Sequence, residues 1–268
     1  MSATLPDKLR FIDSHIHLDF DAFDGMRQPL VAALRQAGLT HLVIPGVSMA
    51  HWPKQKQVAS EYDCHYALGI HPWYCKDDWQ QEVNKLCNLI AQQHQDAKLV
   101  ALGECGLDGL YKETWEWQLG CFEAQLQLAQ QYQLPLIIHS VKAHNEVLAL
   151  LRRIKPQRGG VVHGFYGSVE LAKQYLDLGL KLGIGHLLLN EQAKKLQMLI
   201  AQLPLTSFVI ETDLSLTQKL NQLQLNRFAD DSELILPLLI KKIAELQKKS
   251  SVLISEQMFA NTQQLFDL

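Results

Sequence analysis

The chain has 268 residues, 47% of them hydrophobic, and a formal net charge of −3, so it can bury a large core but offers no global attraction for nucleic acid. Its five cysteines form no C-x-x-C pair, which argues against a disulfide framework or a thiolate zinc site and predicts reduced thiols in the cytosol. No apolar run reaches the length of a membrane span, and residues 1–10 carry no secretory signal.

Eight short runs rich in apolar residues follow one another along the chain and predict β-strands. They cover residues 11–17, 41–47, 66–72, 99–108, 134–140, 160–165, 180–186 and 207–213. The segments between them show helical spacing of apolar residues, as in 26–38, 77–94 and 114–132. Strands that alternate with helices at a period of about 30 residues predict an α/β fold, a parallel (β/α)8 barrel of the TIM type.

The rest of the chain favours a single domain over residues 1–268, because no linker-like composition interrupts this rhythm. After the eighth strand, residues 235–249 and 254–268 have helical patterns and predict C-terminal helices. A doubly wound open sheet is the rival architecture. It normally carries a glycine-rich phosphate-binding fingerprint after its first strand, and this chain has none.

Potential metal ligands stand at the ends of six of the eight predicted strands, which is where the active sites of such barrels lie. They are His15, His17, His71, Glu104, Asp108, His139, His163, Glu211 and Asp213. Each one alone is equally well explained as a capping or buried polar residue. As a set they bring together imidazole nitrogens and carboxylates with no thiolate, a donor set typical of divalent metal sites.

The histidines of this set differ in what their positions predict. His15 and His17 lie two residues apart, so in a strand their side chains point to the same face and form a bidentate arrangement. His71 precedes Pro72, where a ligand role and a substrate contact are both open, and we expect a substrate contact. For His41 and His186 we expect structural roles, since the first opens a strand and the second begins an ordinary loop.

Seven motifs in order, DSHIHLD, GIHP, LGECGLD, LPLIIHS, GVVHGFYGS, ETD and NTQQLF, make the chain resemble the TatD-type metal-dependent hydrolases of the amidohydrolase superfamily. The resemblance implies a (β/α)8 barrel with two divalent metal ions and deoxyribonuclease activity. It also implies that His15, His17 and Asp213 hold one metal, that Glu104 bridges the two, and that His139 and His163 hold the second.

The residue types suit hydrolysis of a phosphodiester. Glu104 is suited to the bridge because a carboxylate offers two oxygens, and Asp213 is suited to ligate a metal and accept a proton from the attacking water. Both are therefore the expected catalytic residues. The ligand types fit Zn, Mn, Mg, Co or Fe, and Asp13 and Asp108 are expected to support the ligands or to cap strands.

The predicted rim carries candidate substrate contacts, although the segment 214–236 departs from the family pattern. Aromatic side chains at Trp73, Tyr74, Tyr111, Phe165 and Tyr166 are suited either to base stacking or to loop packing. Lys76, Lys112 and Lys142 are candidates for phosphate contact, and Trp115 and Trp117 are assigned to helix packing.

The leading hypothesis is a cytoplasmic, monomeric deoxyribonuclease that attacks an end of single-stranded DNA, with no membrane and no obligate protein partner. An amidase, deacylase or lactonase acting on a small molecule is the alternative on the same scaffold, because fold and metal do not fix the substrate. A non-catalytic metal-binding protein is the third reading. It conflicts with a bridging carboxylate, which a closed structural site does not need.

Overall fold

Eight parallel strands, paired in chain order, form one sheet in the computed structural model, which describes residues 9–214 and 234–268. The strands are β1 (Phe11–Asp13), β2 (Leu39–Ile44), β3 (His65–Leu68), β4 (Leu99–Asp108), β5 (Leu136–Val141), β6 (Gly160–Val162), β7 (Leu180–Ile184) and β8 (Phe208–Ile210). Each strand is hydrogen-bonded in parallel to the next, from β1 to β8. The predicted (β/α)8 barrel is confirmed.

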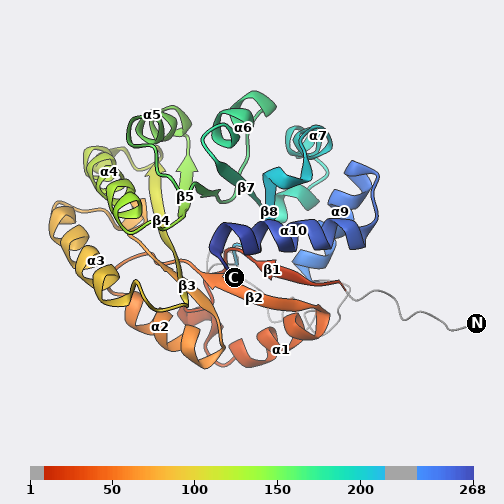
Figure 1. Ribbon diagram of the computed structural model, residues 1–268, viewed down its shortest axis with the longest axis horizontal. Coiled ribbons are helices and arrows are strands. Elements are labelled where there is room, and N and C mark those ends of the chain that lie inside the picture. Colours follow the sequence, from red (N-terminus) through yellow and green to blue (C-terminus); the bar gives the residue numbers. More distant parts are fainter. Residues whose placement is uncertain (1–8, 215–233) are drawn as a thin grey trace, which may run out of the picture.

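Helices follow the strands and surround the sheet (Figure 1). They are α1 (Arg27–Ala37), α2 (Trp52–Glu61), α3 (Trp79–Gln93), α4 (Trp115–Gln131), α5 (His144–Ile154), α6 (Val169–Leu176), α7 (Lys194–Gln202), α9 (Ile235–Gln247) and α10 (Ser251–Phe266). Short 3-10 turns lie between them: η1 (Asp21–Phe23), η2 (Pro72–Tyr74), η3 (Lys112–Thr114), η4 (His186–Leu189) and η5 (Leu205–Ser207). The helices predicted at 26–38, 77–94 and 114–132 and the two C-terminal helices are all present.

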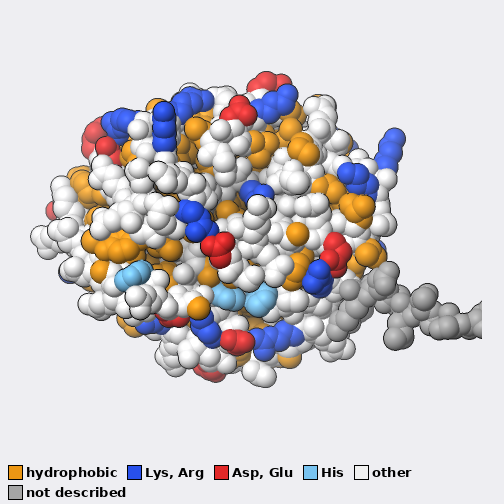
Figure 2. All heavy atoms as spheres, in the orientation of Figure 1, with side chains coloured by type: hydrophobic (Ala, Val, Ile, Leu, Met, Phe, Trp, Pro, Cys, Tyr) orange, Lys and Arg blue, Asp and Glu red, His pale blue; other side chains and the backbone are white. Residues whose placement is uncertain are grey.

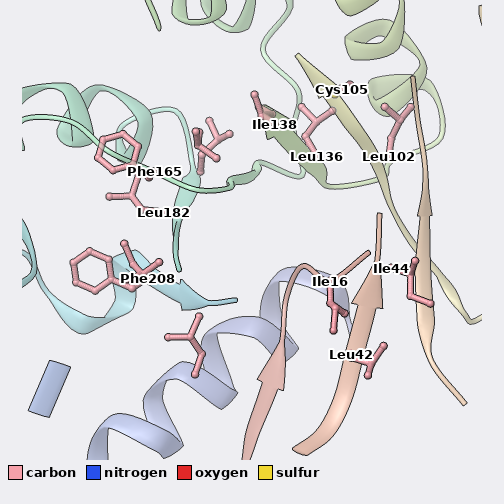
Figure 3. Close-up of a cluster of buried hydrophobic side chains, with 14 of the residues drawn as sticks. Ile16, Leu42, Ile44, Leu102, Cys105, Leu136, Ile138, Phe165, Leu182 and Phe208 are labelled. Atoms are coloured by element: carbon pink, nitrogen blue, oxygen red, sulfur yellow. The ribbon is translucent and has the colours of Figure 1, made fainter. Parts of the chain in front are cut away.

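Side chains alternate along the strands between two apolar layers, as the two-residue repeat of a strand requires. Val43, Ile137 and Val209 belong to a small cluster composed mainly of strand residues, which is the barrel interior. Their neighbours in sequence, such as Leu42 and Ile44, belong to the large cluster that strands share with helices. Figure 3 shows part of this outer layer around the sheet, including Leu102, Leu136, Ile138, Leu182 and Phe208.

Helix α10 packs against the first and the last strand, which meet where the barrel closes (Figure 1). The Ser14 N–H donates to Ile210 O across this junction (3.2 Å). From α10, Asn261 Nδ2 donates to Leu205 O and Phe208 O, both at 2.7 Å, beside β8. The α10 side chains Leu265 and Phe266 join the interior cluster, so this helix also fills part of the barrel.

The extent of the domain, residues 1–268, remains a prediction, because 1–8 and 215–233 lie outside the described residues. The segment 214–236, which departs from the family pattern, falls mostly within 215–233 and so lies largely outside the described residues. Among the described helices, none combines the length and the apolar character needed to cross a membrane.

Candidate metal centre

The strand repeat explains why polar ligands occur where these strands end. Ile137 and Val161 point into the barrel, and His139 and His163 stand two residues further along β5 and after β6. Likewise, His71 follows the inward-facing Ala67 of β3 by four residues. Because side chains two or four residues apart share a face, these histidines continue the inward face at the carboxyl end of the barrel.

Glu104 occupies the centre of this end, and its backbone is held by close contact with neighbouring strands. Its N–H donates to Gly46 O (2.6 Å), and the Gly46 N–H donates to Gly103 O (2.9 Å). A Cβ added at Gly69 would lie only 2.5 Å from Gly103 C, so a side chain at that position would displace the Glu104 segment. The carboxylate itself is 2% exposed.

One oxygen of Glu104 faces the paired histidines of the first strand. Glu104 Oε2 lies 3.2 Å from His15 Nε2 and 3.5 Å from His17 Nε2. Asp213 Oδ1 lies 3.6 Å and 3.8 Å from the same two nitrogens. Two imidazoles and two carboxylates therefore converge on one point, as the resemblance implied for these four residues.

The other oxygen of Glu104 faces a second group of histidines. Glu104 Oε1 lies 2.7 Å from His163 Nε2, 3.1 Å from His71 Nε2 and 3.2 Å from His139 Nδ1. His139 Nδ1 is also 3.2 Å from the facing nitrogens of His71 and His163. The sequence predicts a substrate contact for His71, and the geometry places this residue among the potential ligands as well.

Asp213 reaches the cluster from a turn that follows β8. Its φ of +47° lies in the left-handed region, which Asp adopts more readily than most residues. Its N–H donates to His15 O (2.9 Å), which ties the turn to the segment after β1. With 31% of its side chain exposed, Asp213 is the most accessible carboxylate of the cluster. It is therefore placed to touch both a metal and a solvent molecule.

Burial and mutual charge set the protonation of these groups. Burial lowers the pKa of His17 to about 3 and that of His71 to about 4, so both are neutral at pH 7 with a lone pair available for a metal. Burial alone would raise the pKa of Glu104, but the imidazoles of His163, His71 and His15 hold it well below its ordinary value. Glu104 is therefore an anion in a closely packed ring of nitrogens.

Asp108, expected to support the ligands or to cap a strand, contacts one of them. Its Oδ2 lies 3.1 Å from His139 Nε2 and accepts a hydrogen bond from Trp73 Nε1 (2.7 Å). Burial would raise the pKa of this carboxyl, but His139 and Trp73 lower it. A carboxylate on the far nitrogen of an imidazole fixes the orientation of the ring, so that His139 presents Nδ1 to the cluster. No sequence pattern predicts the hydrogen bond from Trp73 to Asp108.

Two further carboxyls lie beside the cluster rather than in it. Glu211 Oε1 accepts the Gly164 N–H (2.5 Å), and burial raises the pKa of its carboxyl. Asp13 accepts hydrogen bonds from the N–H and the hydroxyl of Thr212 (3.0 and 2.7 Å). Burial raises the pKa of Asp13 to about 7 against those hydrogen bonds. Glu211 thus links the segment after β8 to the segment after β6, and Asp13 links β1 to the segment after β8. The ligands His15, His163 and Asp213 lie on these segments.

A cavity of about 160 Å³ opens over the cluster. Its walls include Phe20, Val47, Trp73 and Tyr74, and its floor carries six of the seven clustered side chains. Phe20 stacks on His17 with ring centroids 4.7 Å apart. The cavity therefore has polar groups at its base and apolar or aromatic walls, an arrangement typical of a small catalytic pocket.

Unpartnered buried atoms show that this cluster fits metal ions. Glu104 Oε2 is buried and accepts no hydrogen bond from any described residue. Three triads bring one ligand atom from each member within 4.8 Å of the others: His15, His163 and Asp213; His15, His17 and Glu104; and His71, Glu104 and His139. A buried carboxylate oxygen without a donor is costly, and a cation is the partner that these imidazole lone pairs would also accept.

The comparisons with known proteins agree with this geometry. The family model of TatD-related DNases matches residues 12–267. The chain belongs to this family. It is thus a metal-dependent hydrolase of the TatD type, with His, Glu and Asp clusters able to hold metals.

Individual relatives cover most of the chain. A metal-dependent hydrolase of Escherichia coli K12, YjjV, is 36% identical over 206 residues, which is 76% of this chain and 79% of that protein. The crystal structure of the same YjjV superimposes with a TM-score of 0.83 and 31% identity, over 97% of this chain and 99% of that one. A protein of Pantoea sp. At-9b named 3'-5' ssDNA/RNA exonuclease TatD is 29% identical over 263 residues, 96% of this chain and 99% of its own.

Proposed function

We propose that this protein is a two-metal phosphodiesterase that removes nucleotides from an end of single-stranded DNA. The single observation that carries the proposal is the split of Glu104, whose two oxygens face two separate groups of imidazoles. The relative named 3'-5' ssDNA/RNA exonuclease, which matches nearly the whole chain, supports the substrate class and favours attack from a 3' end.

Each metal is assigned a set of residues. His15, His17 and Asp213 would hold one ion and His139, His163 and His71 the other, with Glu104 shared between them. The set contains only imidazole and carboxylate donors, which suit Zn, Mn, Co or Fe and leave room for a hydrated Mg. His71 therefore takes the ligand role in this proposal, and its position at the cavity wall also allows it to touch substrate.

The chemistry follows from what surrounds the cavity. When bound, a pair of divalent ions lowers the pKa of a water molecule and neutralises charge on the phosphate oxygens. Asp213, partly exposed beside His15 and His17, would accept the proton of the attacking water through an oxygen that a metal does not use. Asp108 holds His139 in orientation, and Phe20 and Tyr74 limit the access of other water.

The protein is further proposed to act as a monomer in the cytosol. All clustered ligand types come from one chain, so no second copy is needed to complete the site. The five cysteines are unpaired, and four of them are buried, which suits a reducing compartment.

Cleavage of an end-labelled single-stranded DNA oligonucleotide tests the proposal. Chelator-stripped protein would be assayed alone and after addition of Mg²⁺, Mn²⁺ or Zn²⁺, with His163→Ala as the control. We expect ladder-like shortening from one labelled end only with metal, and none with the variant. Binding of about two ions per chain without cleavage of any phosphodiester under any metal would overturn the phosphodiesterase and direct attention to carbonyl esters or amides.

A further inference from the structure

A second hollow lies on the same rim as the metal centre, between the segments that follow β4 and β5. It is lined by Gly109, Lys112, Trp115, Lys142 and Glu146, and its volume is about 320 Å³. Gly109 directly follows Asp108, whose carboxylate contacts His139, so the hollow begins one residue from the metal centre. Helices α4 and α5, which begin at this hollow, are neighbours around the barrel (Figure 1).

The two loops that form the hollow are in direct backbone contact. The Gly109 N–H donates to Val141 O (2.8 Å), and a Cβ added at Gly109 would lie 2.7 Å from Lys142 O. Gln118 of α4 fixes the first loop, since its amide accepts the Asp108 N–H and donates to Tyr111 O (2.8 and 2.9 Å). The hollow therefore has a fixed backbone floor.

The charged groups of the hollow favour an anion. Lys112 and Lys142 are exposed, and neither has an ion-pair partner among the residues that the structure describes. Glu146 is the one carboxylate among the five lining residues, so two ammonium groups face one negative charge. The face shown in Figure 2 mixes basic and acidic side chains. The local pair of lysines therefore indicates anion binding better than the net charge of −3 does.

Exposed aromatic rings connect the hollow to the metal centre. Trp73, which lines the metal cavity, is 48% exposed, and Tyr111, next to Lys112, is 38% exposed. Their ring centroids are 5.6 Å apart. The Trp73 indole is held by its hydrogen bond to Asp108 (2.7 Å), so this ring pair is oriented although it faces solvent. Large oriented rings exposed beside a catalytic cavity are suited to stacking on a flat ligand.

We propose that this hollow and the Trp73–Tyr111 ring pair bind the nucleotide that adjoins the scissile bond of a single-stranded nucleic acid. Lys112 and Lys142 hold its phosphate, Trp115 contacts its sugar or base, and the ring pair stacks on the base nearest the metals. Trp115, assigned to helix packing from the sequence, thus also takes part in binding. The inference rests on the proposed phosphodiesterase function and specifies which side of the cavity the strand occupies.

The test compares a long and a minimal substrate in the metal-loaded enzyme. A Lys112→Ala/Lys142→Ala variant is expected to raise KM for a single-stranded decanucleotide about tenfold or more. The slope of log affinity against log salt should become shallower by about 0.7, because the neutralisation of one phosphate is lost. Hydrolysis of bis(p-nitrophenyl) phosphate, which has no adjoining nucleotide, should keep its wild-type kcat/KM. Lys195→Ala, an exposed lysine on α7 across the barrel from α4, is the matched control.

Two further variants should change the affinity for the oligonucleotide in opposite directions, and they separate the contribution of stacking from that of charge. Glu146→Gln removes the carboxylate of the hollow and should lower KM for the oligonucleotide. Tyr111→Ala should weaken oligonucleotide binding by about 5- to 150-fold, whereas Tyr111→Phe keeps the ring and should bind normally. The Tyr111 hydroxyl makes no hydrogen bond to a described residue, so the Phe variant loses only an exposed polar group.

Failure of this inference is distinguishable from failure of the proposed function. If the wild-type enzyme cleaves oligonucleotides and the lysine variant keeps the same KM and salt slope, the strand lies elsewhere and the inference is wrong. An equal loss on bis(p-nitrophenyl) phosphate would also contradict it, because the lysines would then act on the metal centre. If the wild-type enzyme hydrolyses no phosphodiester, the proposed function itself fails.

Discussion

The two ends of the barrel interior carry opposite chemistry on the same strands. At one end the interior is apolar, with Val43, Ile137 and Val161 packed against Leu265 and Phe266 of α10. At the other end the inward face carries histidines and carboxylates around Glu104. One two-residue step along a strand, about 7 Å, separates the two environments. The apolar end therefore stabilises the barrel, and the polar end accommodates the buried charged groups.

The largest effect is expected from Glu104→Gln at the polar end. The amide keeps the shape but loses the charge and one acceptor, so the second group of imidazoles loses its shared anion. Activity should fall by about 1,000-fold or more. Metal analysis should show fewer ions per chain, while the melting temperature of the stripped protein stays close to wild type.

Glu116→Gln, the same change on the exposed side of α4, is the matched control and should behave as wild type. A folded Glu104→Gln enzyme that keeps wild-type turnover would remove the bridging role from this residue.

At the apolar end, Phe266→Ala should lower the free energy of unfolding without changing the catalytic activity of the folded protein. Phe266 is 2% exposed within the interior cluster, so truncation leaves a cavity and is expected to cost about 3 kcal/mol of unfolding free energy. Denaturant titration measures this loss. Turnover per folded molecule should stay near wild type. Leu253→Ala, on the exposed face of the same helix, should change neither quantity.

Asp108→Asn should have an intermediate effect confined to the polar end. The amide weakens the contact that orients His139, and loss of such a supporting carboxylate typically costs about 10- to 100-fold in metal affinity or activity. Competition with a metal chelator measures the affinity directly. Unchanged metal affinity together with weaker oligonucleotide binding would show that Asp108 acts through Trp73 instead.

The smallest effect is expected at the exposed ion pair between Arg10, which precedes β1, and Glu256 of α10. The hydrogen bond from Arg10 lowers the pKa of Glu256, so the ion pair stabilises the fold above the ordinary pKa of Glu and loses this effect as pH falls through the lowered value. Glu256→Gln should therefore narrow the stability difference between pH 7 and pH 3 slightly, and high salt should erase the change. A large change at pH 7 would contradict this reading.

Much of the polar end could be predicted from sequence because strand ends are local features. An apolar run ending in a histidine or carboxylate marks the rim, so His15, Glu104 and His163 could be found without coordinates. The position of the His71 ring beside Glu104 could not be predicted from the sequence. It depends on the path of the chain after β3, through Gly69 and Ile70 to His71 and Pro72. The hollow at Lys112 and Lys142 depends on contact between two loops, which no single segment encodes.

The apolar end was harder to anticipate. The apolar run Leu42, Val43 and Ile44 predicts a strand, but it does not predict which of these side chains face the helices. The sequence predicts the C-terminal helix but not where it packs. Its position at the junction of β1 and β8 depends on long-range contacts such as those from Asn261, which have no local signature.

The position of α10 also sets an order for biosynthesis. This helix follows all eight strands in the chain, yet it packs on β1 and fills the interior beside Ile137 and Val161. A ribosome-bound chain that lacks α10 would therefore leave one seam of the barrel uncovered and apolar side chains in contact with water. Assembly of the catalytic rim, which needs β1 and β8 side by side, would wait for a segment that contributes none of the clustered ligands.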